Sequence, residues 1–215
     1  MLMNYFQIVS RFFGFLFLPL LLVLPVQAFE NDAVPAYYRV FDVGSTGSLK
    51  IRAQAMAGGT IIGEYALAAG PIEILKIENG WGNVVAGDGN GWVNMAHLIE
   101  IPVPMVGQTS LPEGLLCSGT EPFWGFQLGS AEIVLSRMGE DDQTYSIIEA
   151  DLFEGRTGPD GFVQAAGTSG MLFAIISARQ CSDGMSDRAY GWWVNLLETS
   201  LNDTSAVNGC CSLSM

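Results

Sequence analysis

The sequence predicts an all-β protein made of two small domains. Runs rich in β-branched and aromatic residues recur at a spacing of roughly 8–12 residues, which is typical of sandwiches and barrels. Helical periodicity is weak, and 26 glycines are available for turns. The runs of the first half are YYRVFDV, SLKIR, TIIGEY, PIEILKI and NVVAG, and those of the second are WGFQLG, EIVLSR, YSIIEA, MLFAIIS and WWVNLLE.

The first residues predict an export signal. Residues 12–24 read FFGFLFLPLLLVL, an apolar run that follows Arg11 and precedes the small residue Ala28. This order is typical of a secretory signal peptide over residues 1–28. A retained membrane anchor is the alternative, but a spanning helix needs about 20 apolar residues and Pro25 ends this run early. We expect a secreted, periplasmic protein that contacts the membrane only through this segment, before cleavage.

The charge of the chain and its lack of common catalytic motifs argue against two classes of function, nucleic-acid binding and enzyme catalysis. The chain has 9 basic and 22 acidic residues and a net charge of −13, so it lacks the basic footprint of a nucleic-acid-binding protein. It has no GxSxG, HExxH, P-loop or CxxC motif. His97, the only histidine, has no nucleophile or cysteine beside it. We expect no enzyme activity, no catalytic or metal-binding residue and no cofactor.

A proline-rich stretch divides the chain. Pro102, Pro104 and Pro112 cannot donate backbone hydrogen bonds and restrict the residues before them. We therefore expect an extended linker over 101–113, between one β domain at 36–100 and another at 114–215. All four cysteines follow the linker, and an even number in an exported chain indicates disulfides.

The first domain carries several motifs in a fixed order. SLKIR is followed by IIGEY, by a glycine before PIEILKI, by NGWGNVV and by NGWVNMAHL. This order resembles the bacterial SH3-like (SH3b) family, which implies a small barrel that binds peptidoglycan peptides or targets exported proteins. The loop RAQAMAGG departs from the family, which usually has a proline there. The matching residues are Leu49, Ile51, Arg52, Gly63, Gly70, Trp81, Val84, Gly91, Trp92, Val93 and Leu98.

Two tryptophans and an arginine are the candidate binding residues of this domain. Leu49 and Ile51 alternate and so share one strand face. Trp81 and Trp92 are interpreted as core residues that supply much of the buried area, with a ligand platform as the alternative. We expect Arg52 to bind a nearby loop.

The second domain begins with CSGTEPFWGF and contains CSDGMSDRAY and a late GCC. Together these segments resemble an uncharacterised family of exported bacterial proteins, with GTEPFW and C-x-DGMSDR motifs. Gly191 departs from the family, which often has proline there. The resemblance marks important residues and implies no activity. The candidate residues of this domain are Glu121, Trp124, Asp183, Asp187 and Arg188.

The charged block at 181–190 has three interpretations. Asp183 and Asp187 are candidates for an acid–base pair, for calcium ligands or for caps of a turn. A calcium loop would alternate its acids and end in glutamate, which DGMSD does not. Arg188 is expected to pair with a carboxylate, and Glu121 is the first choice. We favour a structural corner over a ligand clamp, and both over catalysis or metal binding.

The four cysteines allow three pairings. A bond between Cys210 and Cys211 would join Cα atoms about 3.8 Å apart, less than the usual span of about 4.4–6.8 Å. The other two pairings join one late cysteine to Cys181 and the other to Cys117. The family resemblance favours Cys181–Cys210, which leaves Cys117–Cys211.

The sequence is thus interpreted as a non-enzymatic binding protein of the bacterial envelope, with peptidoglycan or an envelope protein as partner. One alternative is an inhibitor of cell-wall hydrolases, a role that small disulfide-bonded barrels serve. The other is an envelope hydrolase that uses Glu121, Asp183 and Asp187.

Overall fold

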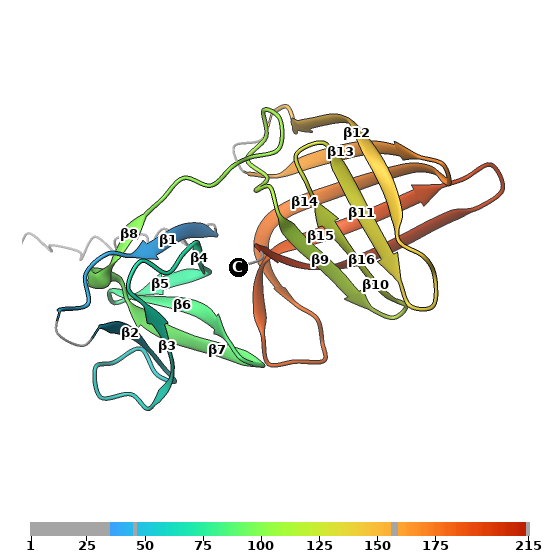
Figure 1. The fold of residues 1–215 in the computed structure, drawn as a ribbon. Coiled ribbons are helices and arrows are strands. Elements are labelled where there is room, and N and C mark those ends of the chain that lie inside the picture. Colours follow the sequence, from blue (N-terminus) through green and yellow to red (C-terminus); the bar gives the residue numbers. More distant parts are fainter. Residues whose placement is uncertain (1–34, 45–46, 156–158, 214–215) are drawn as a thin grey trace, which may run out of the picture.

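The computed structural model describes residues 35–44, 47–155 and 159–213, so the predicted signal peptide lies outside the described residues. Within these ranges the protein is all-β, as predicted, apart from a 3₁₀ turn at Met95–His97. Figure 1 shows two β units joined by one connection. None of the described residues forms a helix long and apolar enough to cross a membrane.

The N-terminal unit, residues 35–100, has two small sheets around one core. One has the strand order β4-β1-β8 and the other β3-β2-β7-β6-β5. In β2 the apolar Leu49 and Ile51 are buried, whereas Lys50 and Arg52 lie on the outer face. Val84 and Val93 complete the core from β6 and β7. The strands are β1 (Ala36–Val40), β2 (Ser48–Arg52), β3 (Ile61–Ala66), β4 (Ile72–Ile74), β5 (Lys76–Glu78), β6 (Trp81–Ala86), β7 (Gly89–Asn94) and β8 (Leu98–Glu100).

The C-terminal unit, residues 115–213, is a closed barrel of eight antiparallel strands. Each strand pairs with the next along the chain, and the last strand closes the barrel on the first (Figure 1). The strands are β9 (Leu115–Thr120), β10 (Phe123–Leu128), β11 (Glu132–Arg137), β12 (Gln143–Leu152), β13 (Gly161–Gly167), β14 (Gly170–Ser182), β15 (Ala189–Thr199) and β16 (Thr204–Leu213).

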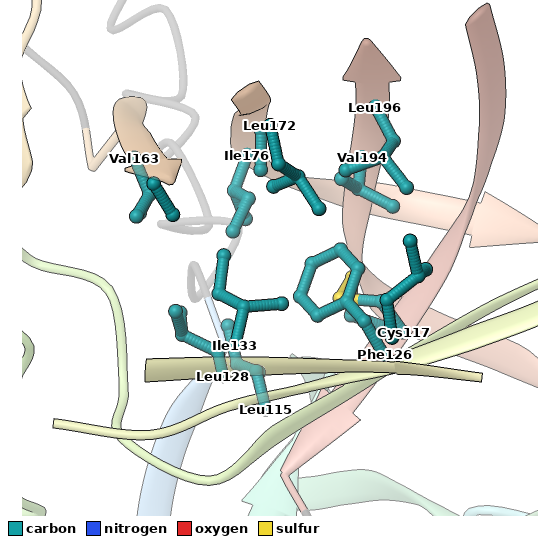
Figure 2. Close-up of a cluster of buried hydrophobic side chains, with 14 of the residues drawn as sticks. Leu115, Cys117, Phe126, Leu128, Ile133, Val163, Leu172, Ile176, Val194 and Leu196 are labelled. Atoms are coloured by element: carbon teal, nitrogen blue, oxygen red, sulfur yellow. A yellow bond between two sulfur atoms is a disulfide. The ribbon is translucent and has the colours of Figure 1, made fainter. Parts of the chain in front are cut away.

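Side chains fill the barrel. Alternate residues of each strand point inward, as Trp124, Phe126 and Leu128 do in β10. Figure 2 shows side chains from opposite walls meeting in the interior, with Phe126 from one wall and Val194 from the other. Eight strands leave an interior just wide enough for such packing. The interior is therefore an apolar core.

Two disulfides join the strands, and the predicted pairing is confirmed. Cys117 of β9 is bonded to Cys211 of β16, and Cys181 of β14 to Cys210. Adjacent residues of a strand point to opposite faces, so β16 sends one bond into the barrel core and the other to its outer wall. Both bonds hold the last strand.

The connection between the units is partly folded. Val106 and Leu111 are buried in the barrel core, and the amide of Val106 donates to the Leu111 carbonyl at 2.9 Å. A β-bridge joins Met105 to Pro112. The expectation of an extended linker is wrong for this part, because its apolar side chains cover one end of the barrel. Only the few residues after β8 remain as a tether.

Candidate functional site

Trp92 lies on the outer face of the five-stranded sheet. Residues opposite each other in adjacent strands share a face. Trp92 is opposite Arg52 of β2 and Asn83 of β6, and Asn83 is opposite Lys76 of β5. The ammonium of Lys76 lies 5.2 Å from the centre of the Trp92 ring, a cation–π contact.

Trp81 lies on the same face, one row away, opposite Asn94. Trp81 and Trp92 are each half-buried. Their interpretation as core residues is wrong: Val84 and Val93 fill the core, and strand alternation turns the tryptophans outward. The platform alternative remains a proposal.

A pocket of about 180 Å³ adjoins Trp81, and Lys50, Arg52, Asn94 and His97 also line it. Nη1 of Arg52 donates to the carbonyl of Gly59 at 2.7 Å, which confirms the expected bond to a nearby loop.

Two further side chains that line the pocket, Lys50 and His97, are held by contacts with their neighbours. Lys50 pairs with Glu64, and the His97 ring places Nδ1 2.7 Å from the carbonyl oxygen of Asp42. The sequence reasoning did not propose Lys50, and it gave His97 no role in a site. Lys50 could have been found, because it lies two residues before Arg52 and so shares its face.

The charged block forms a capped turn between β14 and β15. Oδ1 of Asp183 accepts from the amides of Met185 and Ser186, each at 2.9 Å. Its Oδ2 accepts from the hydroxyls of Ser186 at 2.9 Å and Tyr190 at 3.1 Å. The amide donors, that of Ser186 first, lower the pKa of Asp183 from 3.8 to about 2. These bonds match the turn-capping interpretation.

Replacing Asp183 with alanine is expected to lower stability at pH 7 by about 1 kcal/mol, because the turn loses its cap. The folded pKa is lower than the unfolded one, so this contribution is present above pH 4 and is lost as pH falls towards 2. Urea unfolding at pH 7 measures it. Asp187→Ala, at an exposed position of the same turn, is the control. Equal losses in the two variants would contradict the cap.

The expected pair of Arg188 and Glu121 is wrong. Ion pairs among the described residues join Lys50 to Glu64, Lys76 to Glu78 and Arg137 to Glu198. The guanidinium of Arg188 instead lies 5.3 Å from the centre of the Tyr190 ring. Its Nε is buried and has no hydrogen-bond acceptor in the structure.

The two candidate residues of the GTEPFW motif, Glu121 and Trp124, differ in their exposure to solvent. Glu121 is exposed, whereas Trp124 is 5% exposed. The Trp124 ring stacks on Phe126, with the ring centres 6.0 Å apart. Trp124 is therefore a core residue, and its predicted ligand contact is wrong because no face of it is free.

The end of the charged block contacts the N-terminal unit. The amide of Ala189 donates to Oδ1 of Asn90 at 2.6 Å. A Cβ at Gly191 would lie 2.9 Å from Cβ of Pro35 and 3.2 Å from Leu75, so the backbone approach needs glycine. The departure from the resembled family thus falls where the units touch.

A polar cluster that the sequence reasoning missed lies inside the wall of the barrel. Arg137 pairs with Glu198, which also accepts from the hydroxyl of Tyr145. Burial, and then the bond to Glu198, raises the pKa of Tyr145 to about 12. A polar pocket of about 310 Å³ adjoins the pair. Parity could have placed Glu198 here, because it follows the inward Val194 and Leu196 at the same spacing.

The described residues hold no group of three or more His, Cys, Asp or Glu side chains able to share a metal. Two predicted site residues, Arg52 and Trp81, meet around the pocket beside Trp81. Comparisons of the chain with protein-family models, with curated proteins and with solved structures found no match.

Proposed function

We propose that this protein is an exported, non-enzymatic binding protein of the bacterial cell envelope that recognises peptidoglycan through the pocket beside Trp81. The observation that carries the proposal is the joining of an outward tryptophan with the cations Lys50 and Arg52 around one hollow. The resemblance of the N-terminal motifs to SH3b domains points to the same ligand, by fold-level analogy.

Charge supports an anionic group in the ligand. The chain carries 9 basic residues against 22 acidic ones, yet Lys50, Arg52 and Lys76 share this face. Lys50 is paired there with Glu64 and Lys76 with Glu78, so Arg52 is the cation of this face that has no carboxylate partner among the described residues. Two of them, Lys50 and Arg52, reach the pocket. Peptidoglycan stem peptides present carboxylates, which arginine and lysine bind through charge-assisted hydrogen bonds.

The charged block gives little support to the alternative of a hydrolase. General acids and bases work best with a pKa near the working pH. The pKa of Asp183 is instead lowered to about 2, by the amides of its own turn. Glu121 and Asp187 are exposed, so neither lies in the water-excluded cleft in which a hydrolase holds its catalytic acid.

Sedimentation with purified sacculi tests the proposal. We expect the full chain to cosediment, and Trp81→Ala to weaken binding by about tenfold or more, which corresponds to about 1.4 kcal/mol. Binding should also weaken with added salt, because the cations are partly exposed.

The matched control is Phe123→Ala, at an aromatic residue that is 50% exposed on the other unit. It should bind like the unchanged protein. If the full chain stays in the supernatant, or if both variants lose binding equally, the assignment of this pocket is wrong. If the protein binds an envelope protein and does not bind sacculi, the proposed ligand, peptidoglycan, is wrong.

A further inference from the structure

A carboxyl group lies where the two units meet. Glu73 of β4 is opposite Tyr37 of β1, so both side chains point away from the N-terminal core and towards the barrel. The indole Nε1 of Trp192, in β15, donates to Oε1 of Glu73 and to the hydroxyl oxygen of Tyr37, each at 3.1 Å. The Tyr37 hydroxyl donates to the same Oε1 at 3.2 Å.

This contact is largely closed to water. Tyr37 is 5% exposed and Trp192 is 2% exposed, whereas Glu73 itself is partly buried. The backbone of Leu213, in β16, also lies beside the Glu73 carboxyl and lowers its pKa. One carboxyl therefore joins one strand pair of the N-terminal unit to two strands of the barrel.

Among the residues that the structure describes, the groups facing Glu73 carry no positive charge. From β1 it meets Tyr37, from β15 the neutral indole of Trp192 and from β16 a backbone amide. The nearest lysine along the chain, Lys76, pairs with Glu78. Ionised, this carboxyl is a partly buried anion whose donors among the described residues are all neutral, which is costly.

We propose that Glu73 is a pH-responsive latch between the two units, which holds them together when protonated and weakens their contact when ionised. The neutral carboxyl keeps Oε1 as acceptor for Trp192 and Tyr37 and has no charge to bury. The ionised carboxylate is stabilised when the units separate, because water can then solvate it.

The sign of the effect follows from the shift. Burial raises the pKa of Glu73 from 4.5 to about 7, although its donors oppose the rise. A group whose pKa is higher in the closed form binds protons on closing, so closure is strongest below pH 4.5 and weakens as pH rises through 7. The difference between the two pKa values corresponds to a fall in the closing equilibrium of up to about 300-fold.

The connection suits reversible closing. Residues 105–112 are fixed to the barrel, and the short proline-containing stretch before them tethers the N-terminal unit. The units therefore remain close to each other after the contact breaks, and closing is an intramolecular step.

Hydrogen exchange of the full chain tests the latch. The amide of Ala189 reports closure, because its acceptor Asn90 belongs to the other unit. We expect its protection, corrected for the intrinsic pH dependence of exchange, to fall by about 150-fold between pH 4.5 and 8, because the carboxyl of the open form is already half ionised at pH 4.5. Amides of β11, within the barrel, should keep their protection.

Three variants decide the outcome. Glu73→Gln, neutral at every pH, should remove the pH dependence, and Tyr37→Phe should move its midpoint to higher pH because a donor to the carboxylate is lost. Glu132→Gln, at an exposed carboxyl of the barrel, should change nothing. The latch is refuted if Ala189 protection is flat in the unchanged protein, or if its pH dependence persists in Glu73→Gln. If Glu73→Gln does not fold, an unmoved midpoint in Tyr37→Phe refutes it.

Discussion

The double variant Cys117→Ala/Cys211→Ala is expected to lose about 5 kcal/mol of stability. The bond joins residues 94 apart in the chain, and the chain-entropy model assigns about 4.7 kcal/mol to a loop of about 100 residues. This is a large part of the 5–15 kcal/mol typical of a domain. Thermal or urea unfolding of the barrel measures the loss.

The other bond provides the matched comparison. Cys181 and Cys210 are 29 residues apart, so Cys181→Ala/Cys210→Ala is expected to lose about 4 kcal/mol. It should also leave the barrel core intact, because this bond lies on the outer wall. An order of stabilities reversed between the two double variants would show that chain entropy does not govern this barrel.

The variant Glu198→Ala is expected to destabilise the barrel by about 3 kcal/mol, at the low end for a broken buried ion pair. The side chains of Arg137 and Glu198 are 21% and 15% exposed, so water relieves part of the penalty. The change leaves the guanidinium without its partner and the Tyr145 hydroxyl without that acceptor. Urea unfolding at pH 7 measures it.

Removing both charges should be easier than removing one. Arg137→Met/Glu198→Leu replaces the pair with apolar side chains of similar size, a change that is often close to neutral. The double variant is therefore expected to be more stable than Glu198→Ala. Losses that simply add would mean that the two side chains do not interact in solution.

The all-β fold class and the disulfide pairing could be predicted from the sequence. Strand spacing and alternation predicted strands such as SLKIR, because a half-buried strand must alternate. The pairing of the cysteines needed one further step. Chain geometry disfavoured a bond between the adjacent Cys210 and Cys211, and the motifs favoured the pairing that the structure has.

Contacts between distant segments could not be predicted from the sequence in this way. The size of Trp81 and Trp92 predicts core positions, although the alternation of side chains in their strands, which turns Val84 and Val93 into the core, opposes this prediction. The sequence predicts a carboxylate partner for Arg188, but the guanidinium lies over the ring of Tyr190, two residues along the chain.

The contact of Glu73 with Trp192 joins residues 119 apart in the chain. The sequence around Glu73 does not predict a contact with Trp192, and the sequence around Trp192 does not predict one with Glu73. This contact depends on how two separately folded units pack against each other.

The seam between β9 and β16 sets the order of events during synthesis. One edge of β9 stays unpaired until β16 has been synthesised, because in the closed barrel β16 is the strand that pairs with this edge. Until Cys210 emerges, Cys117 and Cys181 are the only thiols on the chain, and each has only the other as an intramolecular partner. Any bond that forms within the chain before then joins Cys117 to Cys181, and it must be reshuffled before the barrel can close. Chains that have formed this bond should therefore need a disulfide isomerase, and not an oxidant alone, to reach the native pairing.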